Sequence, residues 1–214
     1  MNPVTEALTL AAPDLHSSIA PDAIVLRGAF SENLTEDEFF DFCQQNPTLR
    51  IERLPDQTIA LTAPTGIFPG ARSGEAFLQL GIWHRQHETG LLCDSSTGFT
   101  LPDKSVRSPD ASWLSAERLA TVPAEDRERP GHVCPDFVIE VQSPNDSLRG
   151  LQAKMMDWIA NGVRLGFLIS PPTETAWVYR ADGTVSKITD FEQEISGEDV
   201  LPGFRLELHR LRRR

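Results

Sequence analysis

Apolar and polar residues follow two different periods along this chain, and together these periods predict both helices and strands. Segments at 35–46, 72–89 and 147–161 carry apolar side chains three or four residues apart, the spacing of a helix with one buried face. Shorter apolar runs between Pro, Gly, Asn and Asp residues indicate strands. These runs are 49–54, 58–63, 91–94, 98–101, 106–114, 134–142, 163–169, 175–179 and 200–208. The mixture indicates an α+β class with an α/β core, in which helices flank a mixed sheet.

Short polar turns separate two pairs of these strand segments, which favours β-hairpins. The pairs are 49–54 with 58–63, and 91–94 with 98–101. Pro109 interrupts the segment 106–114 and cannot donate to a β-ladder, so it marks an edge or a bend. Thr35 and Glu38 are expected to form a capping box at the start of the first helix.

The most informative segment is 134–143, an apolar strand that carries a carboxylate at Glu140. Its side chains alternate between two largely apolar faces, which is typical of a central strand covered on both sides. One face holds Phe137, Ile139 and Val141, and the other holds Val138, Glu140 and Gln142. A buried ionised carboxylate is strongly unfavourable unless a cation, a metal ion or a donor compensates it. Glu140 therefore either belongs to a chemical site or lies at a frayed strand end and pairs with an arginine.

A second acid, Asp110, follows Pro109 at the predicted bend, and we expect it to meet Glu140 at one end of the sheet. The polar connection at 117–131 would return the chain so that the two strands lie side by side. Two carboxylates at short range cannot both stay ionised easily without a cation between them. Mg²⁺ suits this position, because it binds through one or two carboxylates together with water and phosphate oxygens.

Two further side chains could act on a phosphate group near these acids. Gln142 shares a strand face with Glu140 and can hold a water molecule or a phosphate oxygen without adding charge. Lys154 lies at the margin of the apolar stripe of helix 147–161, one turn before Trp158, so its ammonium could reach the end of the sheet. The alternative for Lys154 is an ordinary solvated position on the flank of the helix.

The chain carries a series of short motifs in a fixed order. They are Ser108-Pro109-Asp110, Pro135 to Pro144, Leu151 to Met155, Gly162 to Ile169, Val178-Tyr179-Arg180 and Leu201 to Phe204. The first two are similar to the motif strands of the PD-(D/E)XK nuclease superfamily. Together the motifs resemble the Uma family of proposed restriction endonucleases, and the resemblance spans residues 35–208.

This resemblance implies a restriction-endonuclease-like core and a metal-dependent endonuclease that hydrolyses phosphodiester bonds of DNA, with Mg²⁺ or Mn²⁺ as cofactor. By position, Asp110 and Glu140 match the metal-binding acids, and Glu75 matches the accessory acid of the family. Gln142 stands where the superfamily usually has a lysine, and Lys154 is expected to supply the missing charge. The expected catalytic residues are therefore Asp110, Glu140, Gln142 and Lys154. The resemblance also suggests a homodimer.

The overall composition fits a globular protein with one main domain. The chain has 214 residues, and its 20 Lys and Arg against 31 Asp and Glu give a formal net charge of -11, which argues against nonspecific adhesion to nucleic acid or anionic membranes. We expect no membrane segment and no signal peptide. Three dispersed cysteines without metal-ligand spacing favour reduced thiols and a cytoplasmic location. We expect an irregular arm at 1–21, the domain at 22–208 and a basic tail at 209–214.

Several other residues have ordinary explanations beside functional ones. His84 and His87 have a spacing that could bind a metal ion on a helix, but they lack an evident third ligand, so packing is favoured. Asp136 is either a further acid of the site or a residue at the start of the strand. The tryptophans could stack on nucleobases, although most lie on apolar stripes. The Arg-rich C-terminus could contact phosphates or stay solvated.

Two non-enzymatic functions stay open. The first is a catalytically impaired nuclease fold that binds nucleic acid or a partner protein, which the acidic charge and Gln142 both favour. The second is a structural subunit of a homodimer without a surviving site. Convergence of Glu75, Asp110, Glu140 and Lys154 on an open cleft would favour the enzyme, and scatter would favour a binding role.

Overall fold

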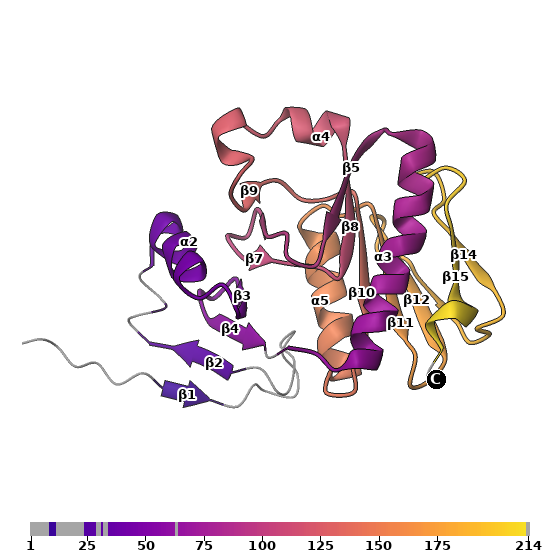
Figure 1. Ribbon diagram of the computed structural model, residues 1–214, viewed down its shortest axis with the longest axis horizontal. Coiled ribbons are helices and arrows are strands. Elements are labelled where there is room, and N and C mark those ends of the chain that lie inside the picture. The colour runs from indigo at the N-terminus through magenta and orange to yellow at the C-terminus, as the bar shows by residue number, and fades with distance from the viewer. Residues whose placement is uncertain (1–8, 12–23, 29–30, 32–33, 63, 213–214) are drawn as a thin grey trace, which may run out of the picture.

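The computed structural model describes residues 9–11, 24–28, 31, 34–62 and 64–212 (Figure 1). In this part of the chain the strands form two large sheets and a two-stranded ribbon, accompanied by helices, so the predicted α+β class is confirmed. Thr9–Ala11 of the predicted N-terminal arm forms strand β1, and the rest of that arm lies outside the described residues. Within the described ranges, no helix has the length and apolar character needed to cross a bilayer.

The first sheet is built from segments in the N-terminal part of the chain (Figure 1, left). Its strands run in the order β1, β2 (Ile24–Arg27), β4 (Ile59–Thr62), β3 (Arg50–Arg53), β7 (Val106–Arg107), β6 (Phe99–Thr100) and β9 (Gly131–His132). Strands β3 and β4 form the first predicted hairpin. Helix α2 (Glu36–Gln45) packs Phe39 against this sheet and begins with the predicted capping box of Thr35 and Glu38.

The second sheet carries the buried central strand that the sequence predicts. Its order is β13 (Val185–Ile188), β12 (Thr175–Arg180), β11 (Leu165–Ser170), β10 (Phe137–Val141), β8 (Ala111–Ser115) and β5 (Gly90–Asp94). Strand β10 is parallel to β11 and antiparallel to β8, which makes the sheet mixed. Every residue of β10 is buried, including Glu140.

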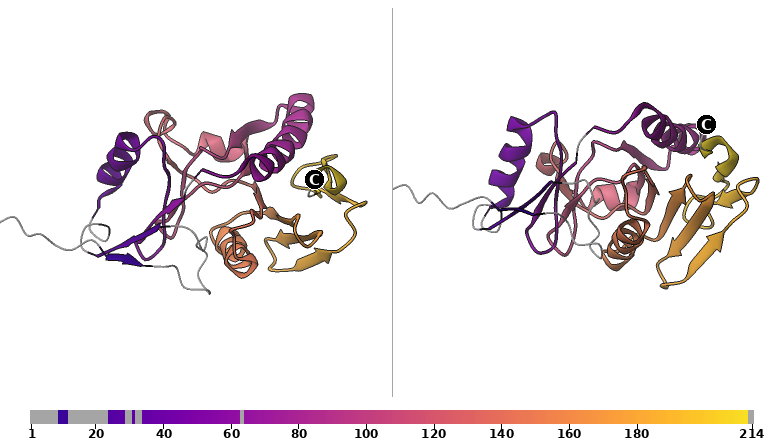
Figure 2. Two further views of the ribbon diagram at one scale, coloured as in Figure 1. Left: turned by 60° about the horizontal axis from the view of Figure 1, so that its bottom comes forward. Right: turned by 90° about the horizontal axis from the view of Figure 1, so that it is seen from below.

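Two long helices cover opposite faces of the second sheet (Figure 2). Helix α3 (Ile67–His87) packs on the face of β10 that carries Phe137 and Ile139. Helix α5 (Leu148–Ala160), capped by Ser147, packs on the face that carries Val138. Alternation along β10 therefore directs Glu140 toward the α5 side, as expected.

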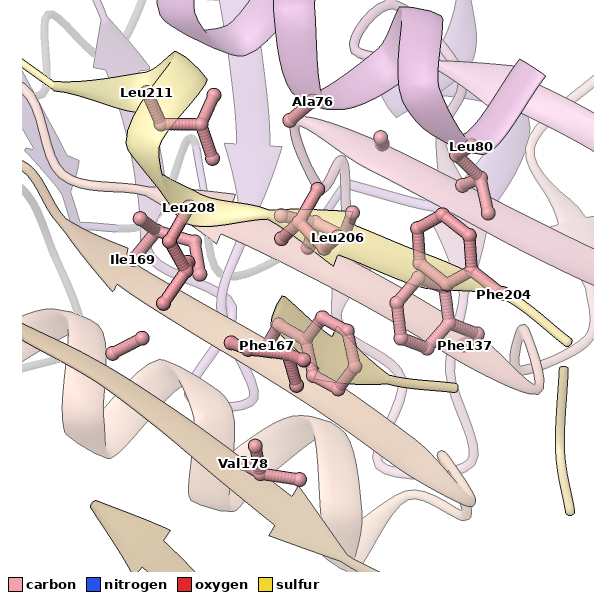
Figure 3. Packing of buried hydrophobic residues seen from close by; sticks show 14 of the residues in the cluster. Ala76, Leu80, Phe137, Phe167, Ile169, Val178, Phe204, Leu206, Leu208 and Leu211 are labelled. Carbon is pink, nitrogen blue, oxygen red and sulfur yellow. The ribbon is translucent and has the colours of Figure 1, made fainter. Parts of the chain in front are cut away.

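The C-terminal segment closes the core beneath α3. Strands β14 (Glu194–Ser196) and β15 (Arg205–Glu207) form the ribbon, and Leu206 and Phe204 pack against Phe137 and Phe167 of the second sheet (Figure 3). The predicted basic tail begins within a 3-10 turn, Leu208–Leu211, whose Leu211 is fully buried. A further short helix, α4 (Ala116–Ala120), follows β8.

The second predicted hairpin is wrong, because its two strands belong to different sheets. Strand β5 pairs with β8, whereas β6 pairs with β7 and β9. Asp94 ends β5 by accepting hydrogen bonds from the backbone N–H of Ser96 and the hydroxyl of Thr97, and the chain then leaves the second sheet. The predicted strand 106–114 likewise divides around Pro109 into β7 and β8, one in each sheet.

Helix α3 begins earlier than predicted, at Ile67 rather than Arg72. Gly66 precedes its first turn, and Pro69 is the third residue of that turn. The first N–H groups of a helix have no partner within the helix, so a proline there removes no hydrogen bond. Strands β13 and β14 were not predicted, because their residues are mostly exposed and polar.

Two adjacent methionines on α5 test the packing of the second sheet. Met155 is fully buried, and its terminal methyl occupies the space that a side chain on Gly166 would fill, whereas Met156 is 50% exposed. We expect Met155→Ala to lower the free energy of unfolding by about 2–5 kcal/mol. Met156→Ala should change it by less than about 0.5 kcal/mol. Urea unfolding followed by circular dichroism measures both, and equal effects would contradict this packing.

Candidate functional site

The candidate site lies where the chain crosses from the first sheet to the second. Strand β7 belongs to the first sheet and β8 to the second, and residues 108–110 join them. The Asp110 Oδ2 atom accepts a hydrogen bond of 2.8 Å from the backbone N–H of Val141. Because Val141 directly follows Glu140, the two acids meet at the end of β10, as the sequence predicts.

A cleft of about 610 Å³ opens beside these two acids. The connection 108–110, strand β10 and helix α5 contribute Asp110, Glu140 and Lys154 to its lining, and strand β3 contributes Arg50 and Glu52. Three of the four predicted catalytic residues therefore converge on one cleft, together with two charged residues from β3.

Lys154 is buried, so a solvated position on the flank of the helix is excluded. Its Nζ atom lies 2.9 Å from Glu140 Oε1 and donates to Glu52 Oε1 at 3.1 Å. One turn later on α5, the indole N–H of Trp158 donates to the same Glu140 oxygen at 3.0 Å. Two residues of one helix therefore orient the Glu140 carboxylate.

Glu52 belongs to this site and was not found from the sequence. Besides Lys154, its carboxylate accepts hydrogen bonds from the Ser108 backbone N–H at 3.1 Å and from Arg107 at 3.4 Å. Burial alone would raise the pKa of Glu52, but Lys154, Arg107, Arg50 and the Ser108 N–H lower it to about 2. The only sequence signal was a charged residue within a short apolar hairpin, which is too common to indicate a site.

The pKa values of Glu140 and Lys154 depend on their burial and on the charged groups around them. Burial raises the pKa of Glu140, and the nearby Asp110 and Glu52 carboxylates add to this effect against the opposing influence of Lys154. Burial alone would lower the pKa of Lys154, but Glu140 and Glu52 outweigh it and raise that pKa. Lys154 therefore stays charged at neutral pH, while Glu140 remains in a place where further positive charge would be favourable.

Two arginines complete the charged network. Arg50, which is partly exposed, donates to the Ser108 carbonyl oxygen at 2.6 Å and pairs with Asp110 at 3.4 Å. Arg107 is fully buried and bridges Glu52 to Asp157 of α5. Arg107 thus connects the first sheet to helix α5, and Arg50 faces the cleft.

The two other predicted site residues make different contacts. The Gln142 Oε1 atom accepts from Ser170 Oγ at 2.6 Å, and its Nε2 donates to the Asp146 carbonyl oxygen at 3.0 Å. Gln142 thus ties the loop after β10 to β11 and does not line the cleft. Glu75 accepts a hydrogen bond from Gln79 on α3 and is also not among the cleft-lining residues. Their catalytic and metal-binding roles stay predictions.

Most of the residues for which the sequence allowed an ordinary explanation beside a functional one make structural contacts. Asp136, at the other end of β10, accepts from the Ser115 N–H and pairs with Arg118 and Arg164. His87 Nδ1 contacts the Trp83 carbonyl oxygen instead of a second histidine. All four tryptophans are buried: Trp83, Trp113, Trp158 and Trp177. Three C-terminal arginines pair with acids of their own chain: Arg205 with Glu194, Arg210 with Glu207, and Arg212 with Glu174 and Glu192.

Asp110 and Glu140 have the chemistry to hold a divalent metal ion. Mg²⁺ commonly binds one or two protein carboxylates and takes its other ligands from water and phosphate oxygens. In the described ranges, His, Cys, Asp and Glu side chains form no group of three or more that could hold a metal ion. The donor set therefore fits Mg²⁺ or Mn²⁺ better than zinc, which needs three or four protein ligands.

The mixed second sheet, covered by α3 on one face and α5 on the other, agrees with the fold that the motifs predicted. A model of the Uma2 family, described as "Putative restriction endonuclease", matches residues 36–209, and the chain belongs to this family. A search of curated proteins gives no match.

One solved structure with the same fold is a putative nuclease of the DUF820 family from Anabaena variabilis. It has 20% sequence identity and a TM-score of 0.66, over 83% of this chain and 97% of that chain. The family indicates a nuclease-like hydrolase as the general class of function.

The low pKa of Glu52 predicts how the network responds to acid. Replacing Glu52 by Gln leaves Lys154 and Arg107 with less compensation, so we expect the free energy of unfolding at pH 7 to fall by about 3–5 kcal/mol. Because the folded-state pKa lies near 2, below the ordinary value of 4.5, the wild-type protein should lose this contribution as the pH falls from 4.5 toward 2. The variant should lack that part of the acid dependence.

Urea unfolding at several pH values measures this difference. Glu125→Gln, at an exposed position outside the network, is the matched control. Parallel stability profiles for wild type and Glu52→Gln between pH 4.5 and 2 would contradict the assigned ion pairs.

Proposed function

We propose that the chain is a divalent-metal-dependent endonuclease that hydrolyses phosphodiester bonds of DNA, with Asp110 and Glu140 as the metal ligands. The observation that carries this proposal is the hydrogen bond from Val141 N–H to Asp110, which holds that acid beside Glu140 in an open cleft. The buried Lys154 lies against one of these two acids, Glu140. Membership of the Uma2 family supports the reaction class.

Some residues would orient the two metal-binding carboxylates, and others would supply positive charge near the phosphate. A bound Mg²⁺ or Mn²⁺ would lower the pKa of a water molecule and stabilise charge on the phosphate. Asp110 is held by the β10 backbone, and Glu140 by Lys154 and Trp158, so both carboxylates are oriented before any ligand arrives. Lys154 supplies the cation that Gln142 cannot, and Glu52 holds the ammonium in place from the other sheet.

Arg50 is proposed to bind the phosphate group of the substrate. It is partly exposed, it lines the cleft, and its pairing with Asp110 is long at 3.4 Å. A metal ion on Asp110 would compete with this pairing and leave the guanidinium available to phosphate oxygens, which its geometry suits. Arg50 would then pair with Asp110 in the metal-free protein and with a phosphate group of the substrate in the metal-bound protein.

The wider features of the protein support a cytoplasmic enzyme. Cys43, Cys93 and Cys134 are all free thiols, and burial raises the pKa of each. A homodimer would offer two sites for the two strands of a duplex. The competing function, a nuclease fold that binds without cutting, is favoured by the involvement of Gln142 in structural hydrogen bonds. A cleavage assay separates the two.

Removing either proposed metal ligand should abolish cleavage. With Mg²⁺ or Mn²⁺, the wild-type protein is expected to cut plasmid DNA, and Asp110→Asn and Glu140→Gln should each lower the rate by more than about 100-fold. Both should also weaken Mn²⁺ binding in calorimetry. Lys154→Ala should lower the rate to a similar extent, because it removes the charge proposed to face the phosphate. It keeps both proposed metal ligands in the chain, so it should weaken Mn²⁺ binding less than Asp110→Asn or Glu140→Gln does.

Controls make this test decisive. A wild-type protein that binds Mn²⁺ and DNA without cutting would establish the impaired fold, and one that binds neither would end both proposals. Glu75→Gln tests the predicted role of Glu75 as the accessory acid. A loss of metal binding or of cleavage in this variant would support that role, and unchanged binding and cleavage would exclude it. Gln142→Ala decides the predicted catalytic role of Gln142 in the same way, with thermal melting as the measure of folding.

Arg50 is tested by separating substrate affinity from chemistry. We expect Arg50→Ala to raise KM for a fluorescent DNA duplex by about 10- to 100-fold, since a charge-assisted hydrogen bond to phosphate is lost. The affinity for Mn²⁺ should stay the same or rise, because a competing cation leaves Asp110. Arg149→Ala, at an exposed position of α5, is the control. A loss of Mn²⁺ affinity in Arg50→Ala with unchanged KM would contradict the role.

A further inference from the structure

Asp146 is a third carboxylate in the cleft that contains the two proposed metal ligands. It lines this cleft together with Asp110 and Glu140. It lies in the loop between β10 and α5, directly before Ser147, the N-cap of α5. Within the residues that the structure describes, no lysine, arginine or histidine forms an ion pair with Asp146. The proposed metal binding therefore leaves this carboxylate without a role.

Two hydrogen bonds fix the position of Asp146 in the loop. Its Oδ2 atom accepts from the backbone N–H of Ser143 at 2.7 Å. Its carbonyl oxygen accepts from Gln142 Nε2 at 3.0 Å, and the Gln142 Oε1 atom in turn accepts from Ser170 on β11 at 2.6 Å. The loop that carries Asp146 is thus tied to the second sheet, and the carboxylate is oriented before any substrate arrives.

Asp146 does not complete a metal site with the other two acids. In the described part of the chain, His, Cys, Asp and Glu side chains form no group of three or more that could hold one ion. Asp146 therefore shares the cleft with Asp110 and Glu140 without sharing a metal ion with both. The cleft measures about 610 Å³, and a water molecule occupies only about 30 Å³. Water and a phosphate group can lie between Asp146 and the two proposed ligands.

The other ionisable groups of the cleft are poorly suited to take a proton from water. Glu140 and Glu52 keep Lys154 protonated, and the two arginines of the lining stay charged. The pKa of Glu52 is about 2, which makes it a very weak base. Asp110 and Glu140 are the proposed metal ligands. Among the described residues that line the cleft, there is no histidine, cysteine or tyrosine.

The surroundings of Asp146 make it a stronger base than an ordinary aspartate. Burial raises its pKa, and the Asp110 carboxylate adds to this effect. Hydrogen bonds from Ser143 and the charge of Lys154 oppose the rise, but they do not cancel it. A general base works best when its pKa approaches the working pH, so this direction favours proton acceptance.

We propose that Asp146 accepts the proton of the water molecule that attacks the phosphate, an inference that rests on the nuclease function proposed above. One O–H bond of the water breaks, and its proton moves to the Asp146 carboxylate. The water oxygen uses the released electron pair to form a new bond to phosphorus. The bond from phosphorus to the leaving sugar oxygen breaks, and this oxygen keeps its electron pair and takes a proton from solvent. Asp146 then releases its proton to solvent.

Asp146→Asn tests this role with little change of shape. The amide oxygen can still accept the Ser143 N–H, but the side chain can no longer take a proton. We expect kcat for plasmid DNA with Mg²⁺ to fall by about 100-fold or more. Mn²⁺ binding in calorimetry should weaken far less than in Asp110→Asn. Asp182→Asn is the matched control, because Asp182 accepts the Thr184 N–H at 2.8 Å in an exposed turn and does not line the cleft.

Chemical rescue separates proton transfer from structural support. Asp146→Ala removes the carboxylate and leaves room for formate, a small carboxylate that can accept the proton in its place. Cleavage by this variant should rise with formate concentration, whereas chloride at the same ionic strength should not restore it. Recovery with chloride, or a failure of formate to restore any cleavage, would overturn the proposed proton transfer.

The outcomes distinguish this inference from the proposed function. If wild type and Asp146→Asn cut DNA equally fast, the inference is overturned and the nuclease function stands. If Asp146→Asn loses Mn²⁺ binding as completely as Asp110→Asn, Asp146 is a metal ligand and not the proton acceptor. If the wild-type protein binds Mn²⁺ and DNA but cuts neither plasmid nor single-stranded DNA, the nuclease function fails, and the inference fails with it.

Discussion

The ammonium group of Lys154 joins the two sheets of this protein. It reaches Glu140 in the second sheet and Glu52 in the first, and it is buried while doing so. A buried ion pair is stabilising only if other groups satisfy the remaining hydrogen-bonding capacity. Here the Ser108 N–H and the Trp158 indole supply those donors. Packing of the two sheets and assembly of the charged cleft therefore depend on the same few atoms.

The helical origin of this lysine changes how the site is positioned. A lysine two residues after Glu140 would be placed by the strand alone, but Gln142 occupies that position and binds the loop to β11. Lys154 is placed instead by the register of α5, which begins at its Ser147 cap. A change at that cap would shift α5 and move the charge relative to the acids, so a residue beside the cleft-lining loop, and not in the cleft itself, helps to set the geometry of the site.

Signals among neighbouring residues predicted most of the helices and strands. Pairings between residues far apart in the sequence could not be predicted in the same way. The capping box of Thr35 and the alternation through Phe137–Val141 rest on neighbouring residues, and both were visible in the sequence. The hairpin expected at 91–101 failed because strand proximity in sequence does not decide which sheet receives each strand. Glu52 was missed because its partner Lys154 lies 102 residues away. The meeting of Asp110 with Glu140 was predictable because the motif strands carry both acids.

Asp110 also has a purely structural duty, since its carboxylate terminates β10 by accepting the Val141 N–H. A buried backbone donor left without an acceptor is destabilising. A relative that had lost its chemistry would therefore still be under selection to keep an acid or amide at this position. An aspartate kept at this position in a homologue would therefore reflect folding as much as catalysis, and only the partners around Glu140 would distinguish an active relative from an inactive one.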